Sequence, residues 1–251
     1  MIALARFGAL VRKGIRFRRR FEAAKKSLGP CAFAWFSYDS FPNLFYIQHL
    51  LKCASLSFRD LAASGPVLDI GAADGGLSFF WESLGYRVDA FDFSGCNINR
   101  MEGLRALASH FKSTIRIHDV NLDGRFDLPR QYGVAFFLGT LYHLKNPFYA
   151  LEAIARHARY CFLSTRVARL SADRRVRLDA LPVAYLLEPA ECNSDATNYF
   201  VFSPAGLMVL VKRAGWVVRG CVTTGACDSD PVSPQADERM FLLLESTAAH
   251  P

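Results

Sequence analysis

Long hydrophobic runs are missing from the sequence: no apolar stretch approaches the ~20 residues needed to cross a lipid bilayer. Paired cysteines are missing too, because the seven cysteines are odd in number and no two form a Cys-x-x-Cys spacing. These absences exclude an integral membrane protein and argue against a secreted disulfide framework or a zinc cluster. We expect a cytoplasmic protein with reduced thiols. No metal is expected, because no metal-ligand spacing to acids or cysteines is found at His49, His110, His118, His157 or His250.

Acidic residues are scarce in the first 30 positions, where nine Lys and Arg residues accompany only Glu22. The net charge of the chain is +7, so the remainder is close to neutral. This distribution excludes a chain that binds nucleic acid over its whole surface. Apolar character is abundant: 51% of the 251 residues are hydrophobic and 13% are aromatic. That is enough for a full core and too much for a disordered chain.

Residues 1–28 have the pattern of an amphipathic helix. Apolar side chains recur at a spacing of three or four residues, or a multiple of it, and arginines lie between them. These apolar residues are Leu4, Phe7, Leu10, Phe17 and Phe21. A signal peptide is not expected, since a longer apolar run and a cleavage site are both missing. Three roles stay open: a helix docked on the domain with a solvated basic face, contact with an anionic membrane surface, or contact with RNA phosphates. The docked helix carries as much weight as the other two together.

We divide the chain into residues 1–60, a basic helix with an aromatic-rich lead-in, and residues 61–251, the main domain. A short helix is expected over 43–51. The aromatic residues of 29–60 either cover a sheet or form a lid over a pocket, and burial is the more common reason for aromatic residues.

From residue 66 onward, short apolar runs alternate with helical patterns. The predicted strands span 67–70, 87–92, 114–118, 133–138 and 160–164, and the predicted helices span 77–84, 97–111 and 147–157. Asn146 is expected to cap the last of these helices and Pro147 to begin it. An insertion is expected at about 166–200, then a helix over 203–214 and two closing strands at 216–221 and 240–245. The alternation predicts an α/β fold with a mostly parallel sheet covered by helices on both faces.

The segment 67–76, Val-Leu-Asp-Ile-Gly-Ala-Ala-Asp-Gly-Gly, places a glycine loop between a strand and a helix. In open α/β sheets ligands bind at the carboxyl ends of the strands, and glycines let the backbone approach them closely. NAD would put its pyrophosphate at the helix N-terminus, next to Asp74 and close to Asp69. S-adenosyl-L-methionine (SAM) has no phosphate and carries an ammonium and a sulfonium, which carboxylates stabilise. We therefore favour SAM over NAD.

The stretch VLDIGAADG resembles the first motif of class I SAM-dependent methyltransferases, and the resemblance extends over about residues 61–221. It implies a Rossmann-like sheet of seven strands with one antiparallel strand near the edge. It also implies that Gly71–Gly75 surrounds the methionine part, that Asp92 binds the ribose, that Phe93 lies against the adenine, and that Asp119 takes the adenine amino group beside Val120. Taken alone, Asp92 is as well explained as a helix cap and Asp119 as a turn residue. The full set of predicted cofactor-binding residues is Asp69, Gly71, Ala73, Asp74, Gly75, Asp92, Phe93, Asp119, Val120, Leu138 and Gly139.

A second stretch, GTLYHLKNP at 139–147, is similar to a motif of tRNA wobble-uridine carboxymethyltransferases and their relatives. In that group an arginine that helps to hold a carboxylated SAM precedes the equivalent of Asn198, but here the position is Thr197, so ordinary SAM is expected. His143 is the best candidate for a general base, and Tyr142 either orients the acceptor or contacts the sulfonium region. The alternative for His143 is a structural hydrogen bond that fixes its loop.

The sequence thus predicts a SAM-dependent methyltransferase whose acceptor is a small molecule, a sugar or a lipid-linked metabolite. Two alternatives remain: a tRNA wobble-uridine-modifying transferase that uses the N-terminal arginines, and a SAM-binding module without catalysis. The intact glycine loop and Asp92 favour catalysis.

Overall fold

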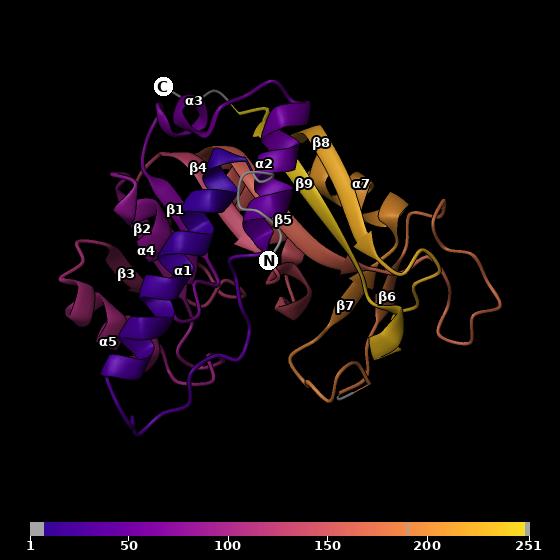
Figure 1. Cartoon of the computed structure of the whole chain (residues 1–251). Coiled ribbons are helices and arrows are strands. Elements are labelled where there is room, and N and C mark those ends of the chain that lie inside the picture. The colour runs from indigo at the N-terminus through magenta and orange to yellow at the C-terminus, as the bar shows by residue number, and fades with distance from the viewer. Residues whose placement is uncertain (1–7, 190, 249–251) are drawn as a thin grey trace.

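The computed structural model describes residues 8–189 and 191–248. Figure 1 shows the arrangement of the elements. The helices are α1 (Ala9–Ser27), α2 (Asn43–Cys53), α3 (Phe58–Ala62), α4 (Gly76–Ser83), α5 (Glu102–Phe111), η2 (Leu141–His143), α6 (Pro147–His157), α7 (Pro204–Arg213) and η3 (Pro234–Ala236). The strands are β1 (Val67–Ile70), β2 (Val88–Asp92), β3 (Arg116–Asp119), β4 (Tyr132–Leu138), β5 (Ala158–Val167), β6 (Ala184–Leu186), β7 (Phe200–Phe202), β8 (Trp216–Gly225) and β9 (Glu238–Ser246).

The strands form one mixed sheet. Strands β3, β2, β1, β4 and β5 lie in that order and are parallel. Strand β9 runs antiparallel between β5 and β8, as expected for one antiparallel strand near the edge. The described sheet has nine strands where seven were expected. The two additional strands, β6 and β7, are short and form an antiparallel pair that joins the sheet where Val167 pairs with Phe202. The predicted α/β fold is confirmed.

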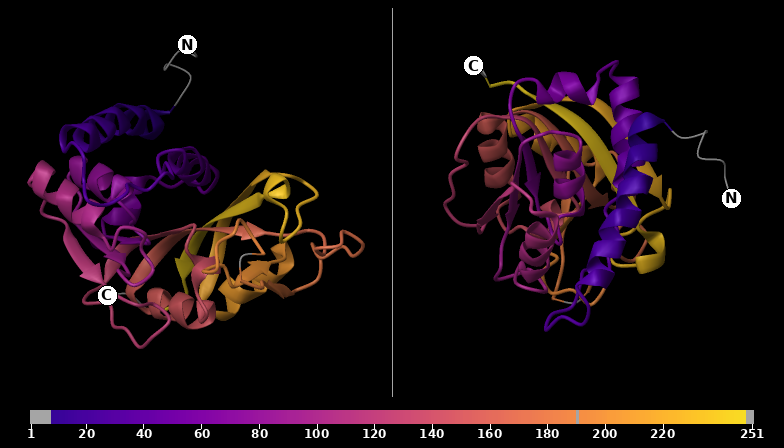
Figure 2. Two further views of the ribbon diagram at one scale, coloured as in Figure 1. Left: turned by 90° about the horizontal axis from the view of Figure 1, so that it is seen from below. Right: turned by 60° about the vertical axis from the view of Figure 1, so that its left-hand side comes forward.

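Helices cover both faces of this sheet, and each face has its own apolar core. Side chains of α1 to α5 pack on one face, where Trp81 stacks on Phe136 with ring centroids 5.0 Å apart. Side chains of α6 and α7 pack on the other face. Figure 2 shows α1 and α2 on the opposite side of the sheet from α6. Because the central strands are buried on both faces, β4 is a nearly continuous apolar run, and β1 is apolar except at Asp69.

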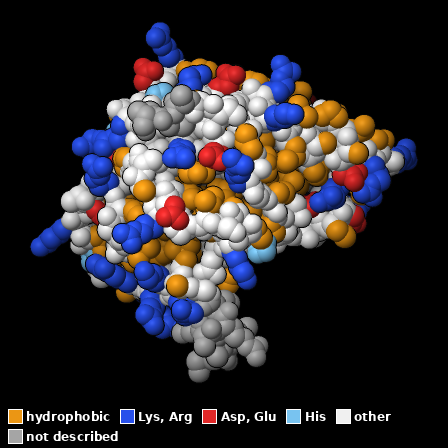
Figure 3. All heavy atoms as spheres, turned by 90° about the horizontal axis from the view of Figure 1, so that it is seen from above, with side chains coloured by type: hydrophobic (Ala, Val, Ile, Leu, Met, Phe, Trp, Pro, Cys, Tyr) orange, Lys and Arg blue, Asp and Glu red, His pale blue; other side chains and the backbone are white. Residues whose placement is uncertain are grey.

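Helix α1 confirms the amphipathic pattern over the part of it that the structure describes, while Leu4 and Phe7 lie outside the described residues. Its buried positions are Val11, Gly14, Phe17, Phe21 and Ala24. A Cβ at Gly14 would collide with the Leu44 side chain, so glycine lets α1 approach α2 closely. The opposite face exposes Lys and Arg side chains, which gather at the lower left of Figure 3. None of the helices within the described ranges is both long and apolar enough to span a membrane.

Two local expectations need correction. Helix α5 begins at Glu102 and not at Asn97, because Asn97 Oδ1 accepts hydrogen bonds from the backbone N–H groups of Asn99 and Met101 and holds a turn there. Asn146 precedes α6 as expected, but its side chain does not cap the helix. Its Nδ2 donates instead to the carbonyl of Asp123, 3.0 Å away.

Candidate functional site

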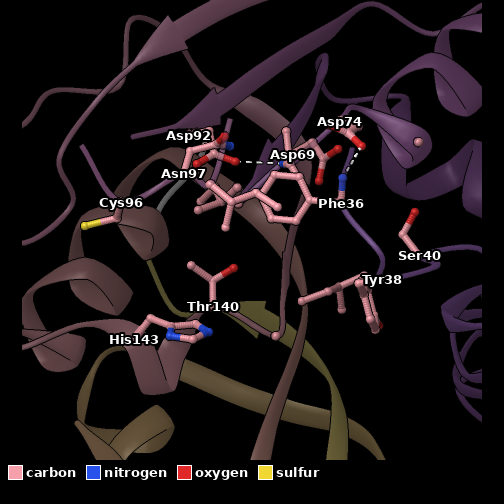
Figure 4. Close-up of a pocket in the computed structure, with 18 of the residues that line it drawn as sticks. Phe36, Tyr38, Ser40, Asp69, Asp74, Asp92, Cys96, Asn97, Thr140 and His143 are labelled. Atoms are coloured by element: carbon pink, nitrogen blue, oxygen red, sulfur yellow. Dashed lines mark hydrogen bonds between the residues drawn. The ribbon is translucent and has the colours of Figure 1, made fainter. Parts of the chain in front are cut away.

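A cavity of about 1170 Å³ opens at the carboxyl ends of β1, β2 and β4. The C-terminal part of α1 and the segment 35–41 form its wall on the other side. Figure 4 shows side chains from both walls pointing into it. Most of the predicted site residues line this cavity, namely Asp69, Gly71, Ala73, Asp74, Asp92, Phe93, Val120, Leu138, Gly139, Tyr142 and His143. Gly75 and Asp119 were also predicted but are not among its lining residues.

The glycine loop has the backbone that its sequence predicts. Gly71 has φ +72° and Gly75 has φ +82°, conformations that favour glycine. A Cβ at Gly71 would collide with Thr140 Oγ1, so a residue that follows β4 already fills the space beside Gly71 and only glycine fits there. Gly71 also lines the cavity, so its backbone atoms can lie directly against a ligand.

Asp92 ends β2 and points toward the glycine loop. Its Oδ2 accepts a hydrogen bond from Ala73 N at 2.7 Å and its Oδ1 from Phe93 N at 2.8 Å (Figure 4). Each oxygen keeps a further lone pair, and the side chain is only partly buried, so it can still accept hydrogen bonds from a ligand. Burial raises the pKa of Asp92. Asp119 is exposed and accepts a hydrogen bond from Ser94 N at 2.9 Å, which holds the pKa of Asp119 below its usual value.

Asp74 is used within the protein. Its Oδ2 lies 2.8 Å from Lys25 Nζ and 2.9 Å from Phe36 N, and its Oδ1 lies 2.8 Å from Asn99 Nδ2. Lys25 therefore balances the negative charge of Asp74, the charge that we expected to repel the pyrophosphate of NAD. Asp69 has no such cation; its Oδ2 accepts the hydroxyl of Ser78 at 2.5 Å, and burial raises the pKa of Asp69 to about 6. Asp69 and Asp92 thus remain as the carboxyl groups available to a cationic ligand.

His143 lies at the opposite end of the cavity, on η2. Its Nδ1 lies 2.9 Å from Thr197 Oγ1 and 3.2 Å from the Thr197 carbonyl oxygen. Since a carbonyl can only accept, Nδ1 carries the proton and Nε2 keeps its lone pair. The Thr197 hydroxyl donates in turn to Asp195 Oδ1 at 2.6 Å. Desolvation by burial lowers the pKa of His143, so the ring is neutral at pH 7.

Sequence reasoning missed four cavity residues that matter: Lys25, Tyr38, Asp195 and Arg239. Arg239 comes from β9, where it pairs in register with Arg166 of β5. A charged residue at the start of a buried strand is the one sequence signal that could have drawn attention to it. Lys25, Tyr38 and Asp195 sit in segments that reach the cavity only through tertiary packing. Among the described residues, no group of three His, Cys, Asp or Glu side chains is placed to hold a metal ion.

The residues of the cavity suit SAM. The backbone of Gly71 lines the cavity beside Asp69 and Asp92, whose carboxyl groups are of the kind that pair with an ammonium or a ribose diol, and Phe93 and Val120 add apolar surface. The lysine near the start of α4, Lys25, is paired with Asp74 and is therefore not free to bind a pyrophosphate.

Comparisons with known proteins agree with this geometry. Residues 41–219 match a family described as "Methyltransferase domain". A search of curated proteins finds no match. Among solved structures, the N-terminal domain of EvdMO1 with S-adenosylhomocysteine (SAH) bound has 16% identity and a TM-score of 0.54, covering 92% of this chain and 97% of that one.

Two further structures share the fold. A putative methyltransferase from Bacillus halodurans has 12% identity and a TM-score of 0.58, covering 80% of this chain and 99% of that one. The glycopeptide N-methyltransferase MtfA, complexed with SAH, has 17% identity and a TM-score of 0.53, covering 90% and 96%. Since the family match spans well over half of the sequence, the chain belongs to the methyltransferase-domain family, and the SAM-dependent enzyme class expected from its glycine loop is confirmed.

Proposed function

We propose that this protein transfers a methyl group from SAM to a small-molecule acceptor and that His143 acts as the general base. One observation carries the proposal: His143, whose Nε2 is left unprotonated by the hydrogen bond of Nδ1, lines the same cavity as the glycine loop and Asp92. The cavity is walled by the segment 35–41 and α1, which suits a small acceptor better than a polymer.

The cofactor end of the cavity is formed by the loop after β1 and by the end of β2. Gly71 and Ala73 would lie against the methionine part, Asp69 would face its ammonium, and Asp92 would accept hydrogen bonds from the ribose hydroxyls. When bound, SAM supplies an activated methyl group on a sulfonium. Phe93, Val120, Leu138 and Gly139 complete the apolar surface of this end.

At the other end, His143 is set up to accept a proton. Its Nδ1–H is fixed by Thr197, whose hydroxyl is held by Asp195, so the ring cannot rotate freely and Nε2 keeps its lone pair. When Nε2 takes a proton, the charge on the ring is stabilised through Thr197 by the carboxylate of Asp195. An acceptor hydroxyl needs such a base, whereas an amine that is already neutral does not. Tyr142, next to His143, would orient the acceptor.

The first test is calorimetric titration with SAM, SAH and NADH. We expect wild-type protein to bind SAM and SAH, and Asp92→Asn to bind both more weakly by roughly tenfold, because charge-assisted hydrogen bonds to the ribose are lost. Asp127→Asn, at an exposed position outside the cavity, serves as the matched control and should bind like wild type. Binding of NADH in place of SAM, or of none of the three, would contradict the proposal.

Modification of a tRNA wobble uridine is the second candidate, and the exposed basic face of α1 favours it. In that case tRNA affinity should fall steeply with salt concentration and should be lost when the exposed arginines Arg16, Arg19 and Arg20 are replaced by glutamine. The same replacements should leave SAH binding unchanged. If tRNA binds equally well to this variant, the basic face is only the solvated side of a docked helix.

A further inference from the structure

Arg239 faces the acceptor end of the cavity, and its two terminal nitrogens form only long hydrogen bonds. Nη1 and Nη2 lie 3.5 and 3.4 Å from the hydroxyl oxygen of Tyr142. The Nε side forms an ion pair with Asp237 at 3.4 Å. The side chain is 27% exposed, so the guanidinium is held mostly out of bulk water without a close, charged partner at its fork.

The charges around Arg239 leave it incompletely balanced. Asp237 is shared, because its other oxygen pairs with Arg166 Nε at 3.3 Å. The neighbouring acids are committed elsewhere: Glu238 pairs with Arg169 and Asp230 with Arg174. Two guanidinium groups therefore depend on one carboxylate, and of the two, Arg239 is the one that lines the cavity.

Arg239 is also close to the reacting end of the site. A Cβ built on Gly139, directly after β4, would lie 3.6 Å from Arg239 Nη1 and 3.8 Å from Tyr142 Oη. The residues that follow Gly139 lead into η2, which carries His143. A group bound at the fork of Arg239 would therefore sit beside Tyr142 and within the same end of the cavity as the proposed base.

We infer that the acceptor is an anion whose carboxylate or phosphate group is bound by the guanidinium fork of Arg239, with the Tyr142 hydroxyl as a further donor. The inference rests on the proposed function and names the class of its substrate. A planar guanidinium makes two parallel hydrogen bonds to either anion, which fixes orientation as well as affinity. Because the fork is largely removed from solvent, salt screens this interaction less than it screens a surface ion pair.

The test uses the full chain saturated with SAH and four probes of the acceptor end: benzoate, phenyl phosphate, inorganic phosphate and neutral benzamide. Calorimetry should show that at least one anion binds, and that benzoate binds about tenfold more tightly than benzamide of the same shape. The difference between the carboxylate and phosphate probes then shows which anion the fork prefers. The preceding SAH titration separates the two proposals, since loss of SAH binding counts against the methyltransferase and not against the anion site.

Variants of Arg239 make the assignment specific. Arg239→Gln should abolish the preference for benzoate over benzamide while SAH still binds, and Arg239→Lys should retain part of it. Arg175→Gln is the matched control, because that side chain is 86% exposed and lies outside the cavity. The inference is overturned if no anionic probe binds the SAH complex, if benzamide binds as well as both benzoate and phenyl phosphate, or if the preference for an anion survives in Arg239→Gln. SAH binding by Arg239→Gln and Arg239→Lys reports whether each variant is folded.

Discussion

Lys25 of α1 and Asp74 of the glycine loop form a buried ion pair, with Nζ and Oδ2 2.8 Å apart and side-chain exposures of 12% and 4%. Phe36 N donates to the same oxygen, so the helix and the segment after it are attached to the loop at one point. The N-terminal segment is thus part of the wall of the site and not an appendage beside it.

Replacing Lys25 by methionine should therefore affect both stability and binding. Removing one partner of a buried pair leaves the other charge uncompensated, which costs roughly 3 kcal/mol. We expect the free energy of unfolding in urea to fall by about that amount and SAH affinity to fall with it. Lys13→Met, on the exposed face of the same helix and outside the cavity, should change neither. Equal effects of the two variants would mean that the pair does not hold the helix in place.

Asp69 should make the protein less stable as the pH rises. Its pKa is about 6 in the fold and near 3.9 in an unfolded chain, so the folded state holds the proton more tightly. Below about pH 4, Asp69 is protonated in both the folded and the unfolded state, so it does not lower the free energy of unfolding. Between about pH 4 and 6 the unfolded state ionises first, and the free energy of unfolding falls. Above about pH 6 the full loss of roughly 2–3 kcal/mol is present.

Asp69→Asn tests this sign, because its side-chain oxygen can still accept from Ser78. Between about pH 4.5 and about pH 7.5, the free energy of unfolding in urea should fall less in Asp69→Asn than in wild type. At the higher pH the variant should be more stable than wild type. SAM affinity at that pH should fall, since the carboxylate that faces the ammonium is gone. A variant that is no more stable at the higher pH would contradict the assignment.

Thr197→Val should alter the pH profile of methyl transfer and leave cofactor binding alone. Burial lowers the pKa of His143, so kcat/KM in wild type should rise to its plateau with a midpoint below the ordinary imidazole value of about 6.5. Valine cannot accept from Nδ1–H or donate to Asp195, and we expect kcat to fall by roughly 10- to 100-fold. Thr197→Ser should restore the rate. An unchanged profile in both His143→Gln and Thr197→Val would leave His143 with a structural role only.

Gly71→Ala should abolish SAH binding. The added Cβ collides with Thr140, and the positive φ costs alanine about 1–3 kcal/mol. Gly85→Ala is the matched control: its φ is +91°, but no atom lies within 4 Å of the added Cβ. Circular dichroism and SAH titration should show a comparable loss of stability in Gly85→Ala with binding intact. Binding by Gly71→Ala as tight as in the control would mean that the ligand does not lie against the Gly71 backbone.

Much of the fold follows from the sequence because it depends on local pattern. Strand β1 and helix α6 have the predicted limits, and β4 differs by a single residue. Helix α3 was missed although Ser57 and Asp60 form a capping box, since five residues are too few for a periodic pattern. The short strands β6 and β7 could not be predicted, because they exist only through pairing with each other and with the end of β5.

In the candidate site, too, the residues placed by local sequence could be predicted and those placed by tertiary contacts could not. The glycine loop and Asp92 lie within one strand–helix–strand unit, so their proximity is a consequence of spacing. Thr197, 54 residues after His143 in the chain, and Arg239, 97 residues after Tyr142, meet their partners only through the folded sheet. From the sequence alone, Thr197 could not be distinguished from a residue of a solvated loop, nor Arg239 from a charged residue at the end of a strand.

Strand β9 lies between β5 and β8, yet it is synthesised after every other described element. During translation β5 therefore has an open edge where β9 will pair, and the stacking of Tyr46 on Phe241 is not yet available to α2. Arg239 enters the cavity only when this strand inserts. The sheet and the acceptor end of the cavity are therefore completed in one late step. Because that step depends on contacts between residues distant in sequence, the protein should fold slowly for its size. Until then it should present an unpaired strand edge to chaperones.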